Sequence, residues 1–365
     1  MSVDVVCSDF HPVVSVKGIS KRHRYDSLSP LRSLTRAIER SAPELVIAAD
    51  DIVTGHLQML RNAERPEIAK LIERSLGPSA SYEIIASRAR FIAAAQSAGA
   101  DAPDCAEVAS ADELKDRLLH FGTPAFLKMD GTWGGDGVRL LRDADDAAGA
   151  FAALTAAARV QASTAPGGAA PIVSVQKAVS GQPANCCAFA WRGEVLGVVS
   201  VVTLQTLREY GIATVVLPVD NLAMRNAAVS IARELKLSGF FGLDFILEDG
   251  GQRAWVIELN QRPTPVAHFA LGAGRDLVAA LISKILERPV ADRPVVFRQD
   301  VAVAMFPHLL RGRAADAAPQ EDWPVGQPQL IGAFARRRQL ADYRDLARSW
   351  MGRREPASLA AEPGR

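Results

Sequence analysis

Apolar and polar residues alternate along the chain in two rhythms, one typical of short buried strands and one typical of amphipathic helices. In the first 80 residues, the apolar run at 3–6 predicts a strand. Ser29 and Pro30 precede apolar residues at helical spacing over 31–38, so we expect a helix to begin there. The apolar run at 45–49 predicts a second, buried strand. Strands and helices that alternate in this way indicate an α/β unit with parallel strands.

From residue 81 onward the pattern becomes richer in strands. Residues 81–99 are helix-rich, and Ser110 is placed to cap a helix over 112–120. Further helices are expected at 145–160, 221–236 and 277–286. The expected strands, several of them joined by short turns, are 123–129, 138–141, 171–179, 187–191, 194–202, 242–247, 255–263 and 302–306. This part of the chain therefore predicts an α+β body.

A glycine-rich loop separates two of these strands. Residues 131–138 read Gly-Thr-Trp-Gly-Gly-Asp-Gly-Val, and Lys128 stands three residues before the loop. A Walker phosphate loop would need a Lys-Ser/Thr pair, and a dinucleotide-binding turn would need a following helix, but neither is present. The loop is therefore the tip of a hairpin. Its amides can surround phosphate oxygens, and the alternative is a plain flexible tip.

Three polar side chains share one face of the strand expected at 255–263. Residues two apart point to the same side of a strand, so Glu258, Asn260 and Arg262 project together. Asp244, on the preceding strand of the hairpin, is a candidate to join them. Carboxylate and amide oxygens suit Mg²⁺ bound with nucleotide phosphates, and a guanidinium can hold a phosphate or acyl-phosphate oxygen. The alternative is a surface hairpin with scattered polar residues.

A further acidic pair, Asp50-Asp51, follows the strand expected at 45–49. Parallel sheets bind ligands at the carboxyl ends of their strands, which makes the pair a candidate on the substrate side. A helix cap explains the pair equally well.

Composition narrows the class of protein. A hydrophobic share of 48% and a charged share of 23% are ordinary for a globular enzyme, and the net charge of +1 argues against nucleic-acid binding through a basic excess. We find no apolar run long enough for a membrane span and no signal-peptide pattern. The four cysteines show no Cys-x-x-Cys spacing, so reduced thiols and a cytoplasmic location are expected.

Taken in order, these parts resemble the ATP-grasp superfamily of ATP-dependent carboxylate–amine ligases and carboxylases. The shared order is a lysine strand before a glycine-rich hairpin, Gln-Lys-x-Val at 176–179, an aspartate at 244 and Glu-x-Asn-x-Arg at 258–262. The resemblance implies an ATP-grasp fold in which two lobes hold ATP and the hairpin closes over the phosphates. It divides the chain into an abbreviated parallel-sheet α/β domain at 1–80, an ATP-grasp domain at 81–290 and a C-terminal extension at 291–365. Within the ATP-grasp domain, the lid and hinge lobe would run to about 180 and the metal-binding lobe would follow from 181.

The resemblance also implies roles for single residues. The implied contacts to the ATP phosphates are Arg88, Lys128, Gly134, Gly135 and Gly137, and the implied contacts to adenine are Gln176, Lys177 and Val179. The implied ligands of Mg²⁺ or Mn²⁺ are Asp244, Glu258 and Asn260. Arg262 would act on the acyl-phosphate together with Lys128, and the candidate contacts to the acid substrate are Arg208, His268 and Arg275. Arg88 departs from the Ser-Lys pair of many relatives, and residues 182–185 offer only amides where relatives place an acid on the ribose.

Three functions fit these expectations. The first is an ATP- and Mg²⁺-dependent ligase that activates a small carboxylate as an acyl-phosphate and joins it to an amine, releasing ADP and phosphate. The second is a carboxylase that activates bicarbonate, and the third is a regulatory protein that binds ATP without turnover. The metal-ligand candidates and Arg262 favour catalysis, because a mere binder could lose them. The expected partners are a small carboxylate and an amine, with no nucleic acid and no membrane, and a homodimer is compatible with them.

Overall fold

The computed structural model describes residues 1–61, 65–130, 137–162, 172–311 and 319–338. Contacts within the chain define two units, one that joins residues 1–26 to 323–365 and one that comprises residues 27–322. The domain boundaries expected at residues 80 and 290 both fall inside the larger unit and stay predictions. In the part of the chain with assigned structure, no helix combines the length and apolar character needed to cross a bilayer.

The smaller unit contains a parallel pair of strands, of which the apolar pattern predicted only the first. Strand β1 (Asp4–Cys7) pairs with β2 (Lys21–Arg24), and the short helix η1 (Pro12–Ser15) lies between them in the chain. Residues 328–338 of the same unit are helical. The backbone N–H of Lys17 donates to the side chain of Gln327 at 2.8 Å, so the two segments of this unit are in direct contact.

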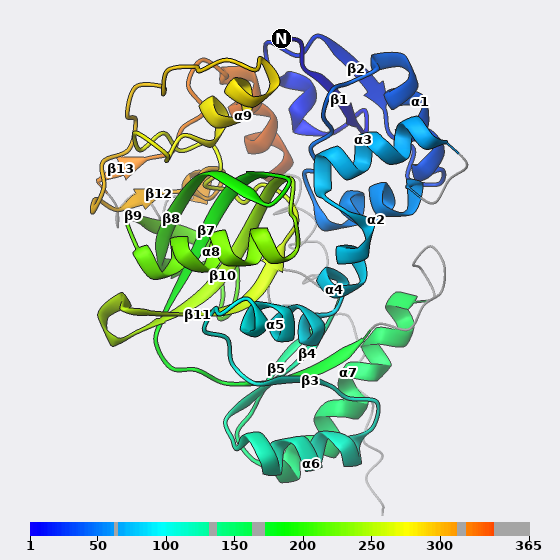
Figure 1. Cartoon of the computed structure of the whole chain (residues 1–365), viewed down its shortest axis with the longest axis vertical. Helices are drawn as coiled ribbons and strands as arrows, with labels where there is room; N and C mark the ends of the chain where they lie inside the picture. Colours follow the sequence, from blue (N-terminus) through cyan, green and yellow to red (C-terminus); the bar gives the residue numbers. More distant parts are fainter. Residues whose placement is uncertain (62–64, 131–136, 163–171, 312–318, 339–365) are drawn as a thin grey trace, which may run out of the picture. The chain divides into compact units, whose positions relative to one another are not determined.

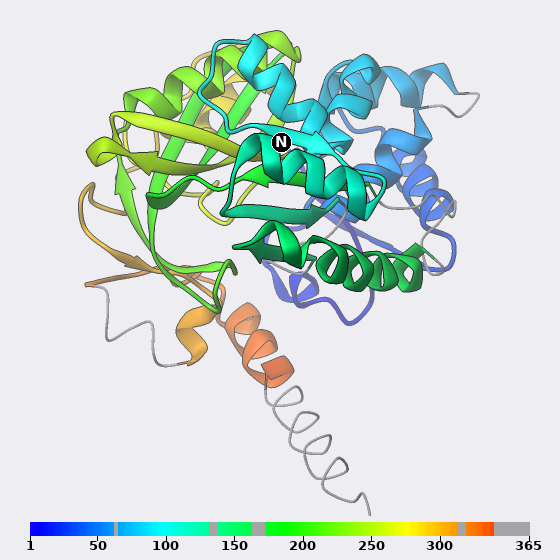
Figure 2. The same ribbon diagram turned by 90° about the horizontal axis from the view of Figure 1, so that it is seen from below.

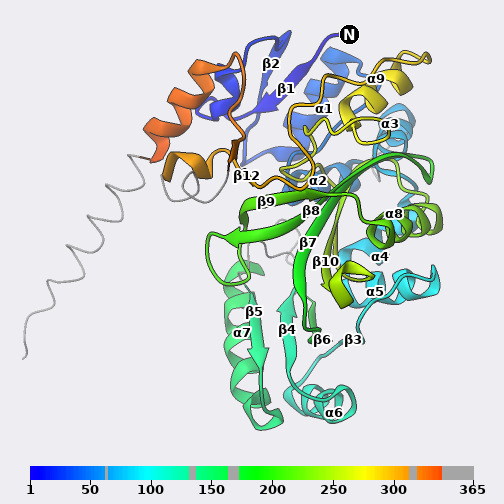
Figure 3. The same cartoon turned by 90° about the vertical axis from the view of Figure 1, so that its left-hand side faces the viewer.

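The larger unit contains a seven-stranded sheet that curves strongly (Figure 3). Its strands, in spatial order, are β11 (Arg253–Asn260), β10 (Gly239–Glu248), β7 (Gln182–Trp191), β8 (Glu194–Thr206), β9 (Ala213–Val219), β12 (Val303–Ala304) and β13 (Gln320–Glu321). The turn at Arg192-Gly193 joins β7 to β8, and η4 (Asp249–Gly251) joins β10 to β11. Both hairpins expected from the sequence are therefore present.

Helices cover both faces of this sheet (Figure 1). On one face, α5 (Arg88–Ser97) and α8 (Leu222–Glu234) pack into a shared core, and on the other face α9 (Leu277–Ile285) packs into a second core. Alternation along β7 sends Cys186 to the first core and Cys187 to the second. All four cysteines are free thiols, as expected from their spacing.

The second sheet is smaller and antiparallel, and two helices cover one of its faces. Its strands, in spatial order, are β3 (Cys105–Glu107), β6 (Val173–Lys177), β4 (Ala125–Met129) and β5 (Val138–Leu141). Helices α6 (Ala111–Phe121) and α7 (Ala147–Ala162) pack together on this face (Figures 1 and 2). Ser110 caps α6 as predicted, since its Oγ accepts from the N–H of Glu113 at 3.1 Å. The opposite face of the sheet is left for polar side chains.

The segment before the sheets is helical, and the strand expected at 45–49 is a wrong prediction. The helices are α1 (Pro30–Ser41), α2 (Asp51–Leu60), α3 (Pro66–Leu76) and α4 (Tyr82–Ala86). Residues 45–49 are irregular: the N–H of Val46 donates to Ser75 Oγ at 3.0 Å, and Ile47 is 46% exposed. An apolar run becomes a strand only beside a pairing partner, and here helix α3 is the neighbour. The strand expected at 302–306 is shortened to β12 (Val303–Ala304).

Candidate nucleotide and metal site

Lys128 and Gln176 lie on the face of the smaller sheet that is opposite α6 and α7. Alternation along β4 sends Leu127 into the core with α6 and α7 and turns Lys128 to the opposite side. Lys128 Nζ donates to Gln176 Oε1 at 2.6 Å and lies 5.5 Å from the centre of the Phe126 ring. Lys128 is only 7% exposed, so burial lowers its pKa to about 8, and the charge of Arg88 adds to this effect.

Arg88 connects the two sheets. It is the first residue of α5, whose N-terminus is capped by Ser87, the Oγ of which accepts from the N–H of Arg90 at 3.2 Å. Its Nη1 donates to Oδ1 of Asp130, directly after β4, at 2.7 Å, and its Nη2 donates to Oε1 of Glu258, on β11, at 2.7 Å. One guanidinium therefore bridges a carboxylate from each sheet.

These contacts set the charge states of the cluster. Burial raises the pKa of Asp130 to about 6, although Arg88 opposes this. Burial also favours a raised pKa for Glu258, but Arg88 and Lys128 outweigh it and hold that pKa below its usual value. Arg88 Nε is buried and has no hydrogen-bond partner among the residues with assigned positions. A buried cation with an unsatisfied donor fits an anionic ligand such as a phosphate oxygen.

A β-bulge aims Glu258 at Asp244. Phe245 pairs with Val256, and both lie in the core against α5 and α8. Asp244 pairs with Glu258, so Ile257 is the extra residue between the two pairs. Without the bulge, Glu258 would share the core face with Val256, because residues two apart point to the same side of a strand. The two carboxylates thus lie opposite each other on neighbouring strands.

Asp244 is held by amide side chains. Asn185 Nδ2 donates to Asp244 Oδ1 at 2.6 Å, and Asn260 Nδ2 donates to Asp244 Oδ2 at 3.2 Å. Thr264 Oγ1 donates to Asn185 Oδ1 at 3.1 Å and so fixes that amide. Burial, followed by the negative charge of Glu258, raises the pKa of Asp244 to about 6.

The donors in this cluster suit a hard cation. Within the described ranges, no group of three or more His, Cys, Asp or Glu side chains could hold a metal ion. The candidate site has two carboxylates, Asp244 and Glu258, and the amide of Asn260. Mg²⁺ is usually bound by one or two carboxylates, with nucleotide phosphates and water as its other ligands. A cation would also relieve the repulsion between the two carboxylates. The residues therefore fit Mg²⁺ bound together with a nucleotide.

Arg262 adds a second guanidinium, from the loop after β11. Its Nη2 donates to Asn260 Oδ1 at 3.1 Å, and its Nε donates to Asp51 Oδ1 at 2.8 Å. Asp50 caps α2 by accepting from the N–H of Val53 at 2.8 Å. Of the acidic pair, the first residue is thus a helix cap, and the second reaches the candidate site.

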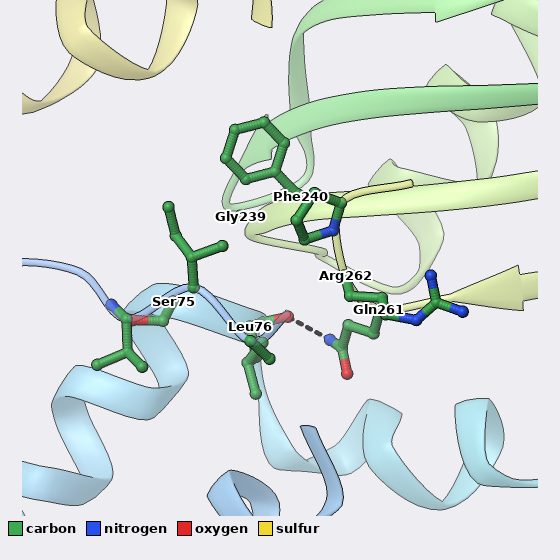
Figure 4. A pocket seen from close by; sticks show the side chains of 10 residues that line it. Ser75, Leu76, Gly239, Phe240, Gln261 and Arg262 are labelled. Carbon is green, nitrogen blue, oxygen red and sulfur yellow. Dashed lines mark hydrogen bonds between the residues drawn. The ribbon is translucent and has the colours of Figure 1, made fainter. Parts of the chain in front are cut away.

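Gln261 points away from this cluster and binds the α2–α3 region instead. Its Nε2 donates to the carbonyl oxygen of Leu76 at 2.6 Å (Figure 4), and its Oε1 accepts from Gln58 Nε2 at 2.9 Å. A cavity of about 10 Å³ lies beside it, lined in part by Phe240 and Pro263. This volume holds about one water molecule, so the cavity is not a substrate pocket as it stands.

The lid and hinge residues expected from the sequence are only partly described. Gly134 and Gly135 lie outside the described residues, whereas Gly137 is described and has a φ of 72°. Lys177 is exposed at the end of β6, and Val179 is half-buried just beyond it. The roles expected for these residues stay predictions.

The candidate contacts to the acid substrate include His268 and Arg275, which have hydrogen-bond partners of their own. His268 Nε2 lies 2.7 Å from Asp322 Oδ1, and Arg275 Nη1 donates to Gln299 Oε1 at 2.7 Å. Arg208 is exposed in the connection between β8 and β9. The substrate roles of these three residues stay predictions, and neither of these two hydrogen bonds leads to the Asp244 carboxylate.

Sequence reasoning did not identify Asp130 or Thr264 as members of the cluster, and it considered Asn185 only for the ribose. The available signal for Asp130 was an acid directly after the lysine strand and before the glycine-rich loop. Thr264 and Asn185 offered no comparable signal, because only the pairing of β7 with β10 places Asn185 opposite Asp244. The sequence therefore predicted the charged residues better than the polar residues that orient them.

Comparison with solved structures defines the class of fold: the chain has the ATP-grasp fold, as the order of its motifs predicted. The biotin carboxylase domain of Hydrogenobacter thermophilus 2-oxoglutarate carboxylase, solved with MgADP, ADP and bicarbonate, matches with a TM-score of 0.61 at 15% identity, over 83% of this chain and 68% of that chain. N5-carboxyaminoimidazole synthase from Aspergillus clavatus, solved with ADP and 5-aminoimidazole ribonucleotide, matches with a TM-score of 0.60 at 16% identity, over 82% and 74%.

Biotin carboxylase from Campylobacter jejuni matches with a TM-score of 0.56 at 16% identity over 73% of this chain, and this chain spans 61% of that protein's length. No family model and no curated protein matches the sequence. Identities of this size show the fold alone, so the chemistry of this chain has to be argued from its own residues.

Proposed function

We propose that this protein is an ATP- and Mg²⁺-dependent ligase that activates a carboxylate as an acyl-phosphate and joins it to an amine, releasing ADP and phosphate. One observation carries the proposal. Arg88 donates directly to Glu258, and Gln176, which is bonded to Lys128, donates to the carbonyl oxygen of Ile257, so the cationic donors meet the strand that carries the metal-ligand candidates within an ATP-grasp fold. Phosphoryl transfer from ATP requires cationic donors for the phosphates and oxygen ligands for Mg²⁺ close to one another.

The proposed roles follow from charge. Transfer of a phosphoryl group to a carboxylate brings anions together, so fixed cations must offset their repulsion. Lys128 and Arg88 would bind the nucleotide phosphates, and Arg88 Nε has no competing partner among the described residues. Asp244, Glu258 and Asn260 would hold Mg²⁺, which supplies further positive charge to the polyphosphate.

Arg262 would stabilise the substrate side of the reaction. Its Nε and Nη2 are held by Asp51 and Asn260, which fixes the guanidinium plane. A fixed guanidinium can bind two oxygens of an acyl-phosphate in defined geometry. Attack of the amine on the acyl carbon would then form the C–N bond and release phosphate.

Bicarbonate is the second candidate for the acid. Its support is that one structural neighbour was solved with bicarbonate and that the neighbours include carboxylases and carboxyaminoimidazole synthases. In that case the activated species would be a mixed anhydride of carbonic and phosphoric acid. The two candidates share the nucleotide and metal site and differ only in the acid.

The test is release of ADP and phosphate from ATP with Mg²⁺, scored against AMP and pyrophosphate. Pools of amino acids, other small carboxylates and bicarbonate would each be offered with pools of amines. We expect ADP and phosphate from one acid pool, and Glu258→Gln should abolish this release. AMP and pyrophosphate, or ADP release unchanged in Glu258→Gln, would overturn the proposal, whereas dependence on bicarbonate would select the second candidate.

A further inference from the structure

We propose that Asp130 is a positioning residue that keeps Arg88 in the nucleotide site when Arg88 releases Glu258 to a metal ion. The inference rests on the proposed function, because it needs Glu258 as a metal ligand and Arg88 as a phosphate contact. Beyond that function, Arg88 and the metal ion would exchange at the carboxylate of Glu258, and Asp130, which the sequence did not single out, would have a role.

Arg88 is attached to Asp130 more firmly than to Glu258. Asp130 accepts two hydrogen bonds from Arg88, from Nη1 at 2.7 Å and from the backbone N–H at 3.2 Å, whereas Glu258 accepts one. The side chains of Arg88 and Asp130 are 8% and 9% exposed, but that of Glu258 is 34% exposed. The better-buried and doubly bonded contact is the one expected to persist when a ligand enters.

The backbone holds Asp130 in place. Its N–H donates to the carbonyl oxygen of Ile172 at 2.8 Å, and it follows directly on β4, the strand that carries Lys128. Asp130 therefore moves with the smaller sheet, while Glu258 moves with the larger one. Arg88 is carried by α5, which packs on the larger sheet, so the exchange concerns only its side chain: Nη2 would leave Glu258 while Nη1 and the backbone N–H stay on Asp130.

The carboxylate of Glu258 would serve two cations. Oε1 accepts from Arg88 Nη2, and a carboxylate oxygen of Glu258 is also needed by the metal ion. Two cations at one carboxylate repel each other, so metal binding and the Arg88 contact are competing events. After the exchange, Nη2 and the unpartnered Nε would both be available to phosphate oxygens, while Nη1 stays on Asp130.

Only a guanidinium can make this arrangement. Its planar fork presents separate N–H groups to Asp130 and Glu258 at the same time, whereas a lysine ammonium is a single point charge. Asp130 also supplies the negative charge that lets Arg88 stay near Lys128 when a further cation arrives. Without Asp130, Arg88 would have Glu258 as its remaining carboxylate partner and would compete more strongly with the metal.

The test measures two bindings on the full-length protein: Mn²⁺ alone, from the paramagnetic resonance signal of the free ion, and Mg·ADP, by calorimetry. We expect Arg88→Ala to bind Mn²⁺ at least about fivefold more tightly and Mg·ADP at least about fivefold more weakly. We expect Asp130→Asn to weaken both bindings. The double variant should bind Mn²⁺ like Arg88→Ala, because Asp130 acts only through Arg88.

Two further variants separate positioning from a general structural role. Glu107→Gln alters a neighbouring carboxylate that accepts from Ser87 and Arg90, and it should leave both affinities unchanged. Arg88→Lys keeps the charge but lacks the planar fork that bridges Asp130 and Glu258, so it should also bind Mn²⁺ more tightly than the unaltered protein. This variant takes the place of Arg88→Ala if Arg88→Ala fails to fold.

Two results would overturn this inference and leave the proposed function standing. In the first, the unaltered protein binds both ligands but Arg88→Ala binds Mn²⁺ no more tightly. In the second, Asp130→Asn weakens Mn²⁺ binding equally whether or not Arg88 is present. If the unaltered protein binds neither Mn²⁺ nor Mg·ADP, the proposed function fails and this inference fails with it.

Discussion

Lys128 is proposed to bind phosphate as a cation, but burial of that cation destabilises the folded protein. Its ammonium is buried between the sheets, and its pKa is lowered to about 8 because burial and Arg88 both disfavour the charged form. The unfolded chain therefore binds more protons than the folded chain between that pKa and the ordinary value of 10.5. Stability should rise with pH across this window, and the full cost of the charge is present below it.

The first prediction concerns this buried amine. Lys128→Met removes the charge at similar size and should raise the free energy of unfolding at pH 7 by on the order of 2 kcal/mol, after loss of the bond to Gln176. The gain should shrink as pH rises above 8, where the unaltered lysine loses its proton. Denaturant titrations at pH 7 and pH 9 check this. A gain that is constant or grows with pH would show that Lys128 is not destabilised as a cation.

At the level of the residue, local patterns singled out the charged side chains. Lys128 was singled out because it precedes a glycine-rich loop, and Glu258 because it shares one face of a strand with Asn260. Asp130 was missed because its partner, Arg88, lies 42 positions away and belongs to a helix. No local pattern indicates a bridge of that length.

Among the elements, strand β11 changes face at its bulge. A plain alternating strand would have placed Val256 and Glu258 on the same side, but the pairing with β10 shows one extra residue. From residue 258 onward, the alternating pattern correctly placed the polar side chains together. It could not reveal the bulge, because Val256 and Ile257 are both apolar and either could face the core. Register was therefore decided by packing.

The second prediction tests the close packing beside this bulge. Gly242, paired with Asn260, has no room for a side chain, since an added Cβ would lie 2.2 Å from Thr264 Cγ2. Gly242→Ala should destabilise the protein by about 1–3 kcal/mol. Thr264→Ser removes that methyl group and keeps the hydroxyl bond to Asn185, so the double variant should recover most of the loss.

Thermal and denaturant unfolding of the four proteins in this cycle measure the coupling directly. Equal losses in the single variant Gly242→Ala and in the double variant would mean that another contact, and not the Thr264 methyl, limits the space at Gly242.

The third prediction concerns how α2 and α3 attach to the loop after β11. Gln261 is 3% exposed and joins Leu76 of α3 to Gln58 of α2. Gln261→Leu would remove the shorter of two hydrogen bonds to the carbonyl oxygen of Leu76, which would keep only the one from the N–H of Ser238 at 3.3 Å, and should cost about 1 kcal/mol. Gln58→Ala removes only the more exposed half of this link and should cost less. The midpoints of denaturant unfolding rank the two variants, and the reverse order would contradict the assignment.

For the whole molecule, the order of motifs predicted the fold, and the geometry of the candidate site required the structure. Lysine strand, glycine-rich hairpin and metal hairpin occur in a sequence order that few folds share, so the resemblance was informative over a long stretch. The first 80 residues were read less well, because an apolar run at 45–49 looks the same whether it pairs with a strand or lies against helix α3. Long-range contacts also decide which polar residues orient the charged ones.

The last prediction depends on both sheets at once. If nucleotide is bound between them, Mg·ADP at about 100 times its dissociation constant should stabilise the protein by about 2.7 kcal/mol, seen as a rise of several degrees in the melting temperature. Lys128→Met on the smaller sheet and Glu258→Gln on the larger should each remove most of this rise, although the first variant should melt higher than the unaltered protein without ligand. Glu107→Gln should keep the full rise. Were Glu258→Gln to retain it, the nucleotide would be bound by the smaller sheet alone, and the metal hairpin would have no part in holding it.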